Sequence, residues 1–313
     1  MSINILFITD LHVKISTFEQ LDHLQKYLQE WIKKAPRLDC IVVGGDTLDT
    51  HEKLCSLSLS KACNFIDFLT QLSPCVYILV GNHDYINNSQ LCTDKHWLNV
   101  LKKWGRVIVV DKPKKSYIKN KGILFVPYVP PGSFNTILES VDSEDANIIF
   151  AHQEFRGCKM GSIESVIGDE WTRDICVISG HIHEMQNVGN VYYPGSSISH
   201  SCSHKSEGPC LVTIDSTLDI NHIGFTAQRK SKQLNANSFD VTTLQQDTKY
   251  IIKGTSVSIA ETLGNPLLRK MLSDRKIVQE TKNVTAQDWE RYLVENVTSS
   301  AMLDDLNRIL SKY

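Results

Sequence analysis

Short apolar runs that end in glycine or polar residues recur along most of the chain. In its first third they alternate with segments in which apolar residues have helical spacing. This alternation predicts an α/β fold whose sheet is at least partly parallel. The predicted strands cover residues 3–9, 38–43, 75–80, 107–110, 122–126, 147–151, 175–179, 191–193 and 210–214. The later strands follow one another with fewer intervening helices.

Three helices are predicted between the early strands. Residues 17–34 place Leu21, Leu24 and Leu28 on one face, which is the spacing of an amphipathic helix. Thr17, with Gln20 three residues later, predicts a capping box at the start of that helix. The other two predicted helices cover residues 53–72, which end before Ser73-Pro74, and residues 90–104.

The character of the chain changes after about residue 225, where a polar stretch without periodicity begins. We expect one domain over residues 1–228 and a small C-terminal module over residues 229–313. In the module, residues 249–259 alternate enough for a strand, and residues 285–311 have the spacing of one or two helices.

Composition narrows the class of protein. The chain has 313 residues, of which 42% are hydrophobic and 22% charged, with a formal net charge of -2. Disorder and coiled coil are excluded, and any contact with nucleic acid must depend on local basic patches. No apolar run is long enough to cross a membrane. The opening residues MSINILFITDLH lack the features of a signal peptide.

The nine cysteines are odd in number and none stands in C-x-x-C spacing. This usage is typical of a reducing compartment. We therefore expect an intracellular protein. It would be cytoplasmic, or nuclear if it functions in a eukaryotic cell or an infected host.

Five predicted strands end in residues that bind metals. The sequences there are Asp10-Leu-His12, Gly-Gly-Asp46-Thr-Leu-Asp49, Gly-Asn82-His83-Asp84, His152, and Gly-His181-Ile-His183. In open α/β sheets the carboxyl ends of the strands are where sites form. A single pair of this kind arises by chance in a chain of this length, but the ordered set does not.

The types of residue indicate a particular chemistry. Carboxylate, imidazole and amide oxygen suit Mn²⁺, Fe²⁺ or Zn²⁺. Two ions held close together need a carboxylate that bridges them, with separate ligands on each side. The set contains enough ligands for two ions without His83. Hydrolysis of phosphoesters is the reaction that such a pair of ions supports best.

These motifs, in this order, resemble those of the calcineurin-like metallophosphoesterase superfamily, and the resemblance covers about residues 3–225. Within it, GDTLDT, AHQEFRG and YYPGSS look most like the SbcD-type nuclease subunits of DNA repair and recombination, in a phage or viral version. Protein phosphatases of the superfamily read GDxVDRG and GNHE instead. The resemblance implies a β-sandwich flanked by helices in four αββα layers, with a C-terminal capping module.

The resemblance also implies roles for individual residues. One ion would be held by Asp10, His12 and His183, and the other by Asn82, His152 and His181. Asp46 would bridge the ions, which are Mn²⁺ by this resemblance. His83 would stand beside the scissile phosphate as a catalytic group rather than a ligand, oriented by Asp49. Asp84 is either a second candidate for that orienting role or a carboxylate that caps the loop.

Resemblance further implies partners. DNA would be the substrate, and a separate SMC-like, ABC-type ATPase would gate its entry, since this chain has no G-x-x-x-x-G-K-[ST] motif of its own. A homodimer also fits the family. Exonuclease and endonuclease activity are not distinguished.

Several alternatives stay open. The chain could belong to another branch of the superfamily, such as a phosphatase or a cyclic-nucleotide phosphodiesterase, or it could tether DNA ends without cutting them. Residues 112–121 hold five lysines around Tyr117, which fits either a solvated hairpin or a contact with the DNA backbone.

Two further segments allow two interpretations each. His200, Cys202 and His204 are better interpreted as a Ser-rich loop at the rim of the site than as another metal site. The predicted helix that begins at Thr285 carries Trp289 and would either cap the module or bind the ATPase.

Overall fold

The computed structural model describes residues 2–51, 53–143, 145–200, 208–225, 230–235 and 248–253, with residues 255, 258, 264 and 266. It divides the chain into two compact units, Met1–Gln228 and Arg229–Tyr313. Each unit is described by itself. The functions that we assign to the two parts remain predictions.

The first sheet of unit 1 is built around the N-terminal strand. Its strands, in spatial order, are β14 (Leu218–His222), β13 (Cys210–Ile214), β1 (Ile3–Ile8), β2 (Cys40–Val43), β3 (Val76–Leu79) and β4 (Val107–Val110). The strands from β1 to β4 run parallel, whereas β13 pairs antiparallel with both β1 and β14. The carboxyl ends of β1, β2 and β3 therefore meet at one edge of the sheet.

The second sheet repeats this arrangement. Its order is β11 (Gln186–Val188), β12 (Val191–Tyr193), β10 (Val177–Gly180), β7 (Ala146–His152), β6 (Lys121–Val126) and β5 (Lys114–Ile118). The four central strands are parallel, and the edge strands β5 and β11 are antiparallel to their neighbours. A short hairpin of β8 (Lys159–Met160) and β9 (Ile163–Glu164) follows β7.

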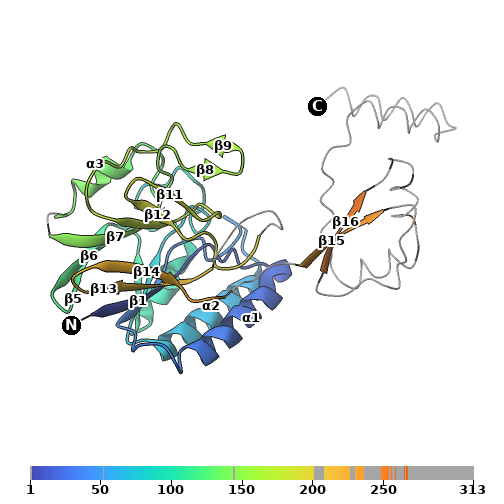
Figure 1. The fold of residues 1–313 in the computed structure, drawn as a ribbon, viewed down its shortest axis with the longest axis horizontal. Helices are drawn as coiled ribbons and strands as arrows, with labels where there is room; N and C mark the ends of the chain where they lie inside the picture. The colour runs from blue at the N-terminus through green and yellow to red at the C-terminus, as the bar shows by residue number, and fades with distance from the viewer. Residues whose placement is uncertain are drawn as a thin grey trace. The chain divides into compact units, whose positions relative to one another are not determined.

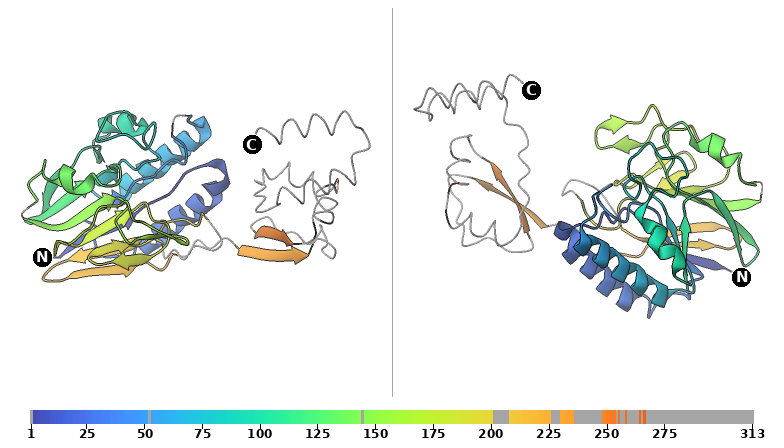
Figure 2. Two further views of the ribbon diagram at one scale, coloured as in Figure 1. Left: turned by 90° about the horizontal axis from the view of Figure 1, so that it is seen from above. Right: turned by 180° about the vertical axis from the view of Figure 1, so that it is seen from behind.

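Helices cover the outer faces of the two sheets (Figure 1). The helices α1 (Phe18–Trp31) and α2 (Ser56–Leu72) lie side by side on the first sheet, as both views in Figure 2 show. Leu21, Leu24 and Leu28 of α1 are fully buried, which is the face that the sequence predicts. The second sheet is covered more lightly, by α3 (Phe134–Leu138) and by loops.

The hydrophobic core has three layers, one between the two sheets and one on the outer face of each sheet. Between the two sheets, Phe125 lies stacked between Tyr77 and Phe150, with ring centroids 4.1 and 5.9 Å away. The other two layers lie between each sheet and the helices and loops outside it. This mixed α/β architecture of two facing sheets flanked by helices is the fold class that the sequence predicts.

Two of the helix predictions differ from the structure in their details. Thr17 does not cap α1 through its side chain; its hydroxyl accepts a hydrogen bond from the Lys14 amide instead, within a short 3-10 turn (η1, Ile15–Thr17). The helix predicted at 90–104 is a 3-10 helix (η2) over Trp97–Lys103. The predicted capping box is therefore wrong, and the helix predicted at 90–104 is shorter and tighter than expected.

Unit 2 is described over one pair of strands. β15 (Lys230–Asn235) and β16 (Thr248–Lys253) pair in parallel. β16 overlaps the strand predicted over residues 249–259 and begins one residue before it, whereas β15 falls in the stretch that lacks periodicity. The helices predicted over residues 285–311, with Trp289, lie outside the described residues. In the part of the chain that is described, no helix has the length and apolar character required to cross a membrane.

Candidate metal centre

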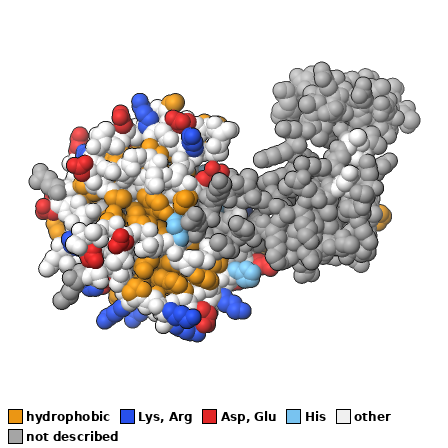
Figure 3. Space-filling model, in the orientation of Figure 1, with side chains coloured by type: hydrophobic (Ala, Val, Ile, Leu, Met, Phe, Trp, Pro, Cys, Tyr) orange, Lys and Arg blue, Asp and Glu red, His pale blue; other side chains and the backbone are white. Residues whose placement is uncertain are grey.

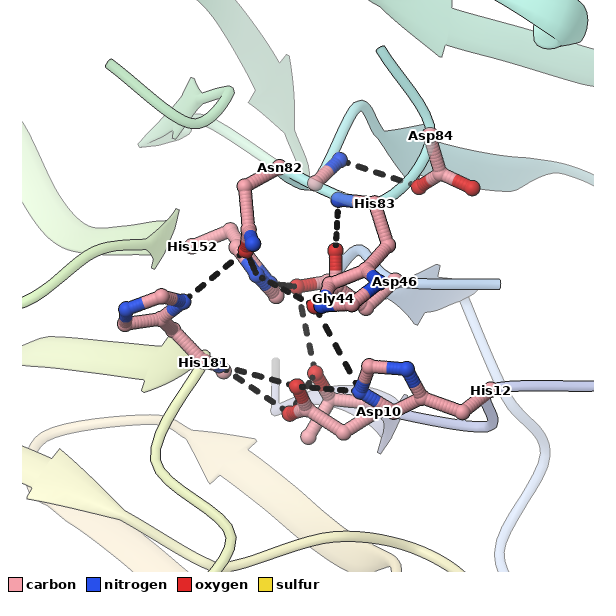
Figure 4. Close-up of polar contacts among 12 residues, drawn as sticks. Asp10, His12, Gly44, Asp46, Asn82, His83, Asp84, His152 and His181 are labelled. Atoms are coloured by element: carbon pink, nitrogen blue, oxygen red, sulfur yellow. Dashed lines mark hydrogen bonds and ion pairs between the residues drawn. The ribbon is translucent and has the colours of Figure 1, made fainter. Parts of the chain in front are cut away.

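The predicted metal ligands converge from both sheets (Figure 4). Asp10 and His12 follow β1, Asp46 follows β2, and Asn82 follows β3. From the second sheet, His152 ends β7, and His181 and His183 follow β10. The parallel strands of each sheet end on the same side, which is why residues so far apart in sequence meet here. All seven lie within one cluster of contacts.

Three of these residues form what we call the first ligand group: Asp10, His12 and His183. The Nε2 atoms of His12 and His183 lie 3.1 Å apart. The carboxylate of Asp10 lies 3.9 Å from His12 and 3.7 Å from His183. All three offer ligand atoms within 4.8 Å of one another, close enough to share one ion.

The second ligand group consists of Asn82, His152 and His181. The amide oxygen of Asn82 lies 3.1 Å from Nε2 of His152 and 3.0 Å from Nδ1 of His181. The other nitrogen of His152, Nδ1, lies 2.6 Å from the carbonyl oxygen of Gly44. Because a carbonyl only accepts, Nδ1 carries a proton and Nε2 faces the centre. Burial lowers the pKa of His152, but the charge of Asp46 outweighs this and raises it to about 9, so Nε2 must lose its proton before it can bind an ion.

Asp46 joins the two groups. A single oxygen, Oδ2, lies 3.4 Å from Nε2 of His12 and 3.3 Å from Nε2 of His152. Its other oxygen accepts a hydrogen bond of 2.8 Å from the amide of His83. Burial raises the pKa of Asp46, but the charge and hydrogen bond of His152 outweigh this and hold the pKa well below its ordinary value. The carboxylate is thus ionised and placed between the groups.

This donor set fits a pair of divalent ions. Metal binding requires imidazole nitrogens without protons. Burial lowers the pKa of His181 to about 3 and that of His183 to about 2, so both rings are neutral at physiological pH. A set of ligands that combines carboxylate and amide oxygens with imidazole nitrogens suits Mn²⁺, Fe²⁺ or Zn²⁺. Asp46 supplies the shared carboxylate that a two-ion centre needs.

The backbone of the site is held in unusual conformations. Asp10, His12, Asp46 and His181 all have positive φ, at 53°, 39°, 50° and 79°, although residues with a Cβ rarely adopt this region. Such strain is found where the surrounding structure fixes a functional group. Close packing contributes: a Cβ on Gly180 would lie 2.1 Å from the hydroxyl of Thr9 and 2.6 Å from the carbonyl of Gly44.

His83 stands beside the two ligand groups and is oriented by the main chain. Its Nδ1 lies 2.8 Å from the carbonyl oxygen of Asp49, which fixes Nδ1 as the protonated nitrogen and leaves Nε2 free to exchange a proton. Burial lowers the pKa of His83. The ring is flanked by His12, edge-on at 4.7 Å, and by His51, stacked at 4.7 Å.

The carboxylate of Asp49 contacts other residues than the family pattern suggests. It lies 2.8 Å from Nζ of Lys14 and 3.5 Å from Nδ1 of His12. Burial raises the pKa of Asp49, but its contacts with His12 and Lys14 outweigh this and lower it. Asp49 therefore contacts His83 through its backbone and His12 through its side chain.

Asp84 caps a loop. It accepts hydrogen bonds from the amides of Gly81, Thr47 and Leu48 and from the indole of Trp97. The chain after β2 is thereby tied to the chain after β3, so Asp84 braces the loops that carry Asp46 and Asn82. Of the two interpretations, this contact pattern favours the capping carboxylate.

Two histidines at the site lie outside the set predicted from the motifs. His51 stacks on His83, and the ring of His200 lies 4.9 Å from that of His12. Neither stands at the end of a strand, so the pattern that found the other residues could not find these. The H-x-C-x-H spacing drew attention to His200, but Cys202 and His204 lie outside the described residues.

The lysine-rich segment at 112–121 forms β5 and its turn into β6. Tyr117 is 61% exposed, and Lys115 lies 2.9 Å from Asp142 and 5.4 Å from the ring of Tyr117. Lys119 pairs with Asp39. On the face of unit 1 drawn in Figure 3, lysine and arginine side chains are interspersed with acidic ones among the described residues. These contacts fit both a solvated hairpin and a contact with the DNA backbone.

Comparison with known proteins gives viral relatives. The protein named "Putative phosphoesterase 244L" from Invertebrate iridescent virus 6 is 41% identical over 255 residues, which cover 78% of this chain and 89% of that protein. "Putative phosphoesterase 078R" from Invertebrate iridescent virus 3 is 43% identical over 211 residues, which cover 66% of this chain. The match spans only 60% of the length of the second relative.

Among solved structures, an archaeal phosphodiesterase is 14% identical with a TM-score of 0.35, over 70% of this chain and 99% of that one. So low a score adds nothing to the assignment. The family described as Calcineurin-like phosphoesterase matches residues 3–185, a range that contains both ligand groups, Asp46 and His83. The chain belongs to the calcineurin-like phosphoesterase family.

Proposed function

We propose that this phosphoesterase is a Mn²⁺-dependent nuclease of the SbcD type, which hydrolyses phosphodiester bonds in DNA. The single observation that carries the proposal is the position of Asp46, whose one oxygen lies within 3.4 Å of an imidazole from each ligand group. Two ions held on either side of it would supply a water activated for attack and charge to stabilise the phosphorane-like transition state.

The residues of the chain divide the remaining work. The two ligand groups and Asp46 would hold the ions, and the neutral His181 and His183 would bind them without losing a proton. His83 has Nδ1 fixed on a main-chain carbonyl, so Nε2 is the atom through which the ring would act: once Nε2 has taken up a proton, the imidazolium could donate it to the leaving oxygen. The lysines of 112–121 are the candidate contact for the DNA backbone.

The biological setting is also a proposal. We infer an SMC-like ATPase as partner, with DNA recombination, replication or repair as the process, on the motifs that resemble SbcD-type subunits. A homodimer belongs to the same proposal. The cysteine usage of the sequence, odd in number and without C-x-x-C spacing, and the viral source of both relatives support a function inside an infected cell.

The decisive experiment compares substrates under one set of conditions. Metal-free protein is supplied with Mn²⁺, Mg²⁺ or Zn²⁺ and given labelled duplex DNA, single-stranded DNA, bis(p-nitrophenyl) phosphate and p-nitrophenyl phosphate. We expect Mn²⁺ to support cleavage of DNA and of the diester, and EDTA to abolish both. His83→Ala is the catalytic control, and His23→Ala, at an exposed position of α1, is the matched control for loss of a histidine.

The outcomes separate the candidate functions. Rapid hydrolysis of the monoester with intact DNA would identify a phosphatase and overturn the nuclease proposal. Binding of two ions and of DNA without hydrolysis of any substrate would identify a DNA-end tether. Cleavage that survives His83→Ala would point to a contaminating nuclease.

A further inference from the structure

The segment that follows the second sheet runs back over the first ligand group. The amide of Ser197 donates to the carbonyl of Thr9, and the hydroxyl of Ser197 accepts from the amide of Thr9 at 2.8 Å. The amide of Ser196 donates to the carbonyl of His183 at 3.2 Å. Both serines are buried. The segment therefore ties the residue before Asp10 to the residue that completes the group.

His200 extends this attachment to Asp10 itself. Its Nε2 lies 2.6 Å from the carbonyl oxygen of Asp10. A carbonyl cannot donate, so Nε2 carries the proton. Asp10 has φ of 53°, a conformation that costs free energy unless neighbouring groups fix it. The amide of Asp10 is held by the carbonyl of Gly45 at 3.1 Å, and His200 holds its carbonyl.

The ring of His200 also contacts the two imidazoles of the group. Its centroid lies 4.9 Å from that of His12, nearly perpendicular at 80°, and 5.0 Å from that of His183. His12 and His183 are themselves 4.9 Å apart. The three rings thus form a triangle in which His200 packs against both ligands. No described contact links His200 to the second ligand group.

We propose that His200 is a positioning residue that holds Asp10, His12 and His183 in place, and that it sets the affinity of the first ligand group for its ion while leaving the second group unaffected. This inference rests on the two-ion site of the proposed function and adds a residue that the motifs do not include. Substitution of a residue that orients a metal ligand without touching the ion typically weakens metal binding by about 10–100-fold.

The test titrates metal-free protein with Mn²⁺ and measures the number and affinity of bound ions by equilibrium dialysis with mass spectrometry. We expect wild-type protein to bind two ions. His200→Ala should bind one with wild-type affinity and the other about 10–100-fold more weakly. His23→Ala should bind both as wild type does.

Two conservative variants separate the hydrogen bond from the ring contacts. His200→Gln keeps a side-chain N–H donor and loses the ring, and we expect it to recover part of the lost affinity. His200→Phe keeps a ring without a donor, and we expect it to behave like His200→Ala. The thermal transition of each metal-free variant is recorded, so that weaker binding is interpreted only where the variant is folded.

The proposal is overturned if His200→Ala and His200→Phe bind both ions with wild-type affinity, or if every folded variant loses both ions equally. Recovery by Phe and not by Gln would overturn the role of the hydrogen bond to Asp10. Failure of the proposed function looks different: wild-type protein would then bind fewer than two ions, or bind two and hydrolyse no diester, whatever residue stands at position 200.

Discussion

The two ligand groups are similar in composition but differ in how they are held. His152 of the second group has no exposed side-chain surface, and a main-chain carbonyl fixes its outer nitrogen. His183 of the first group is 28% exposed in its side chain, and His12 faces Asp49, which in turn pairs with the half-exposed Lys14. The second group thus includes a ligand whose ring is fixed by buried main chain, whereas the first includes a partly exposed ligand and a ligand ring that faces another side chain.

This difference suggests that the two groups retain their ions with different affinities. Ligands fixed by the main chain are preorganised, because few rotamers remain to be lost when the ion binds. Ligands fixed by other side chains can be retuned by single substitutions at those neighbours. We therefore expect the second group to retain its ion more tightly and the first to exchange its ion more readily.

Asp46→Ala is the change that should abolish the distinction between the groups. Its carboxylate serves both, so we expect neither ion to be retained at wild-type affinity and hydrolysis to fall by more than about 10⁴-fold. Metal analysis by mass spectrometry and diester hydrolysis measure the two effects. If the variant kept two ions, Asp46 would not be the bridging residue.

His83→Ala should leave both ligand groups intact and slow only the hydrolysis step. We expect two bound ions and a decrease in hydrolysis of about 10²–10⁴-fold, the loss typical of a missing general acid. The decrease should be smaller for a diester with a good leaving group, such as bis(p-nitrophenyl) phosphate, than for DNA. Loss of ions from this variant would instead make His83 a ligand, since it also lies near His12 and Asp46.

Asp49→Ala should weaken the first group alone. The side chain contacts His12, whereas His83 is held by the backbone carbonyl, which the substitution keeps. We expect one ion to bind about 10–100-fold more weakly and the rate at saturating Mn²⁺ to stay close to wild type. A large drop in that rate with normal metal binding would show that the carboxylate, not the carbonyl, orients His83.

The smallest expected effect concerns Asp84 and pH. Burial raises the pKa of Asp84 to about 6 from an ordinary value of 3.8. The folded protein then holds this proton more tightly than the unfolded chain does. The group therefore stabilises the fold most at low pH, and this stability is lost as the pH rises through about 6.

Asp84→Asn does not titrate and serves as the reference. Between about pH 5 and pH 7, the free energy of unfolding of metal-free wild type should fall by about 1 kcal/mol relative to the variant. Denaturant titrations across this range measure the difference. Parallel pH profiles would show that Asp84 ionises in the folded protein as it does in the unfolded chain.

Most of the first unit was predictable because two strong signals coincide in it. Apolar runs fix β1, β2, β3, β7 and β10, and polar residues that end those runs fix the ligands, because parallel strands bring their carboxyl ends together. The edge strand β4 was predicted, but the edge strands β5 and β14 were not, for a related reason. β5 reads KKSYI and β14 reads LDINH, with half-exposed patterns that burial does not force to be apolar.

The neighbours of the ligands were harder to predict than the ligands. That Asp49 contacts His83 by its carbonyl and His12 by its carboxylate depends on how the loop folds, and no residue type encodes it. His200 sits in a loop without periodicity, and its partner is a main-chain oxygen that every residue possesses. Such contacts depend on tertiary structure, which a single sequence does not display.

The N-terminal strand β1 lies in the middle of its sheet, between β2 and β13, and this has a consequence in time. Asp10 and the amide of His181 that contacts it are 171 residues apart, and β1 pairs with β13 at Ile3 and Ile214. A ribosome that adds about 5–20 residues per second would take roughly 10 s or more to pass from the first ligand to the last. Until then the ligand set is incomplete, and one edge of β1 stays unpaired, an exposure that we expect to slow the folding of this domain and to increase its tendency to aggregate.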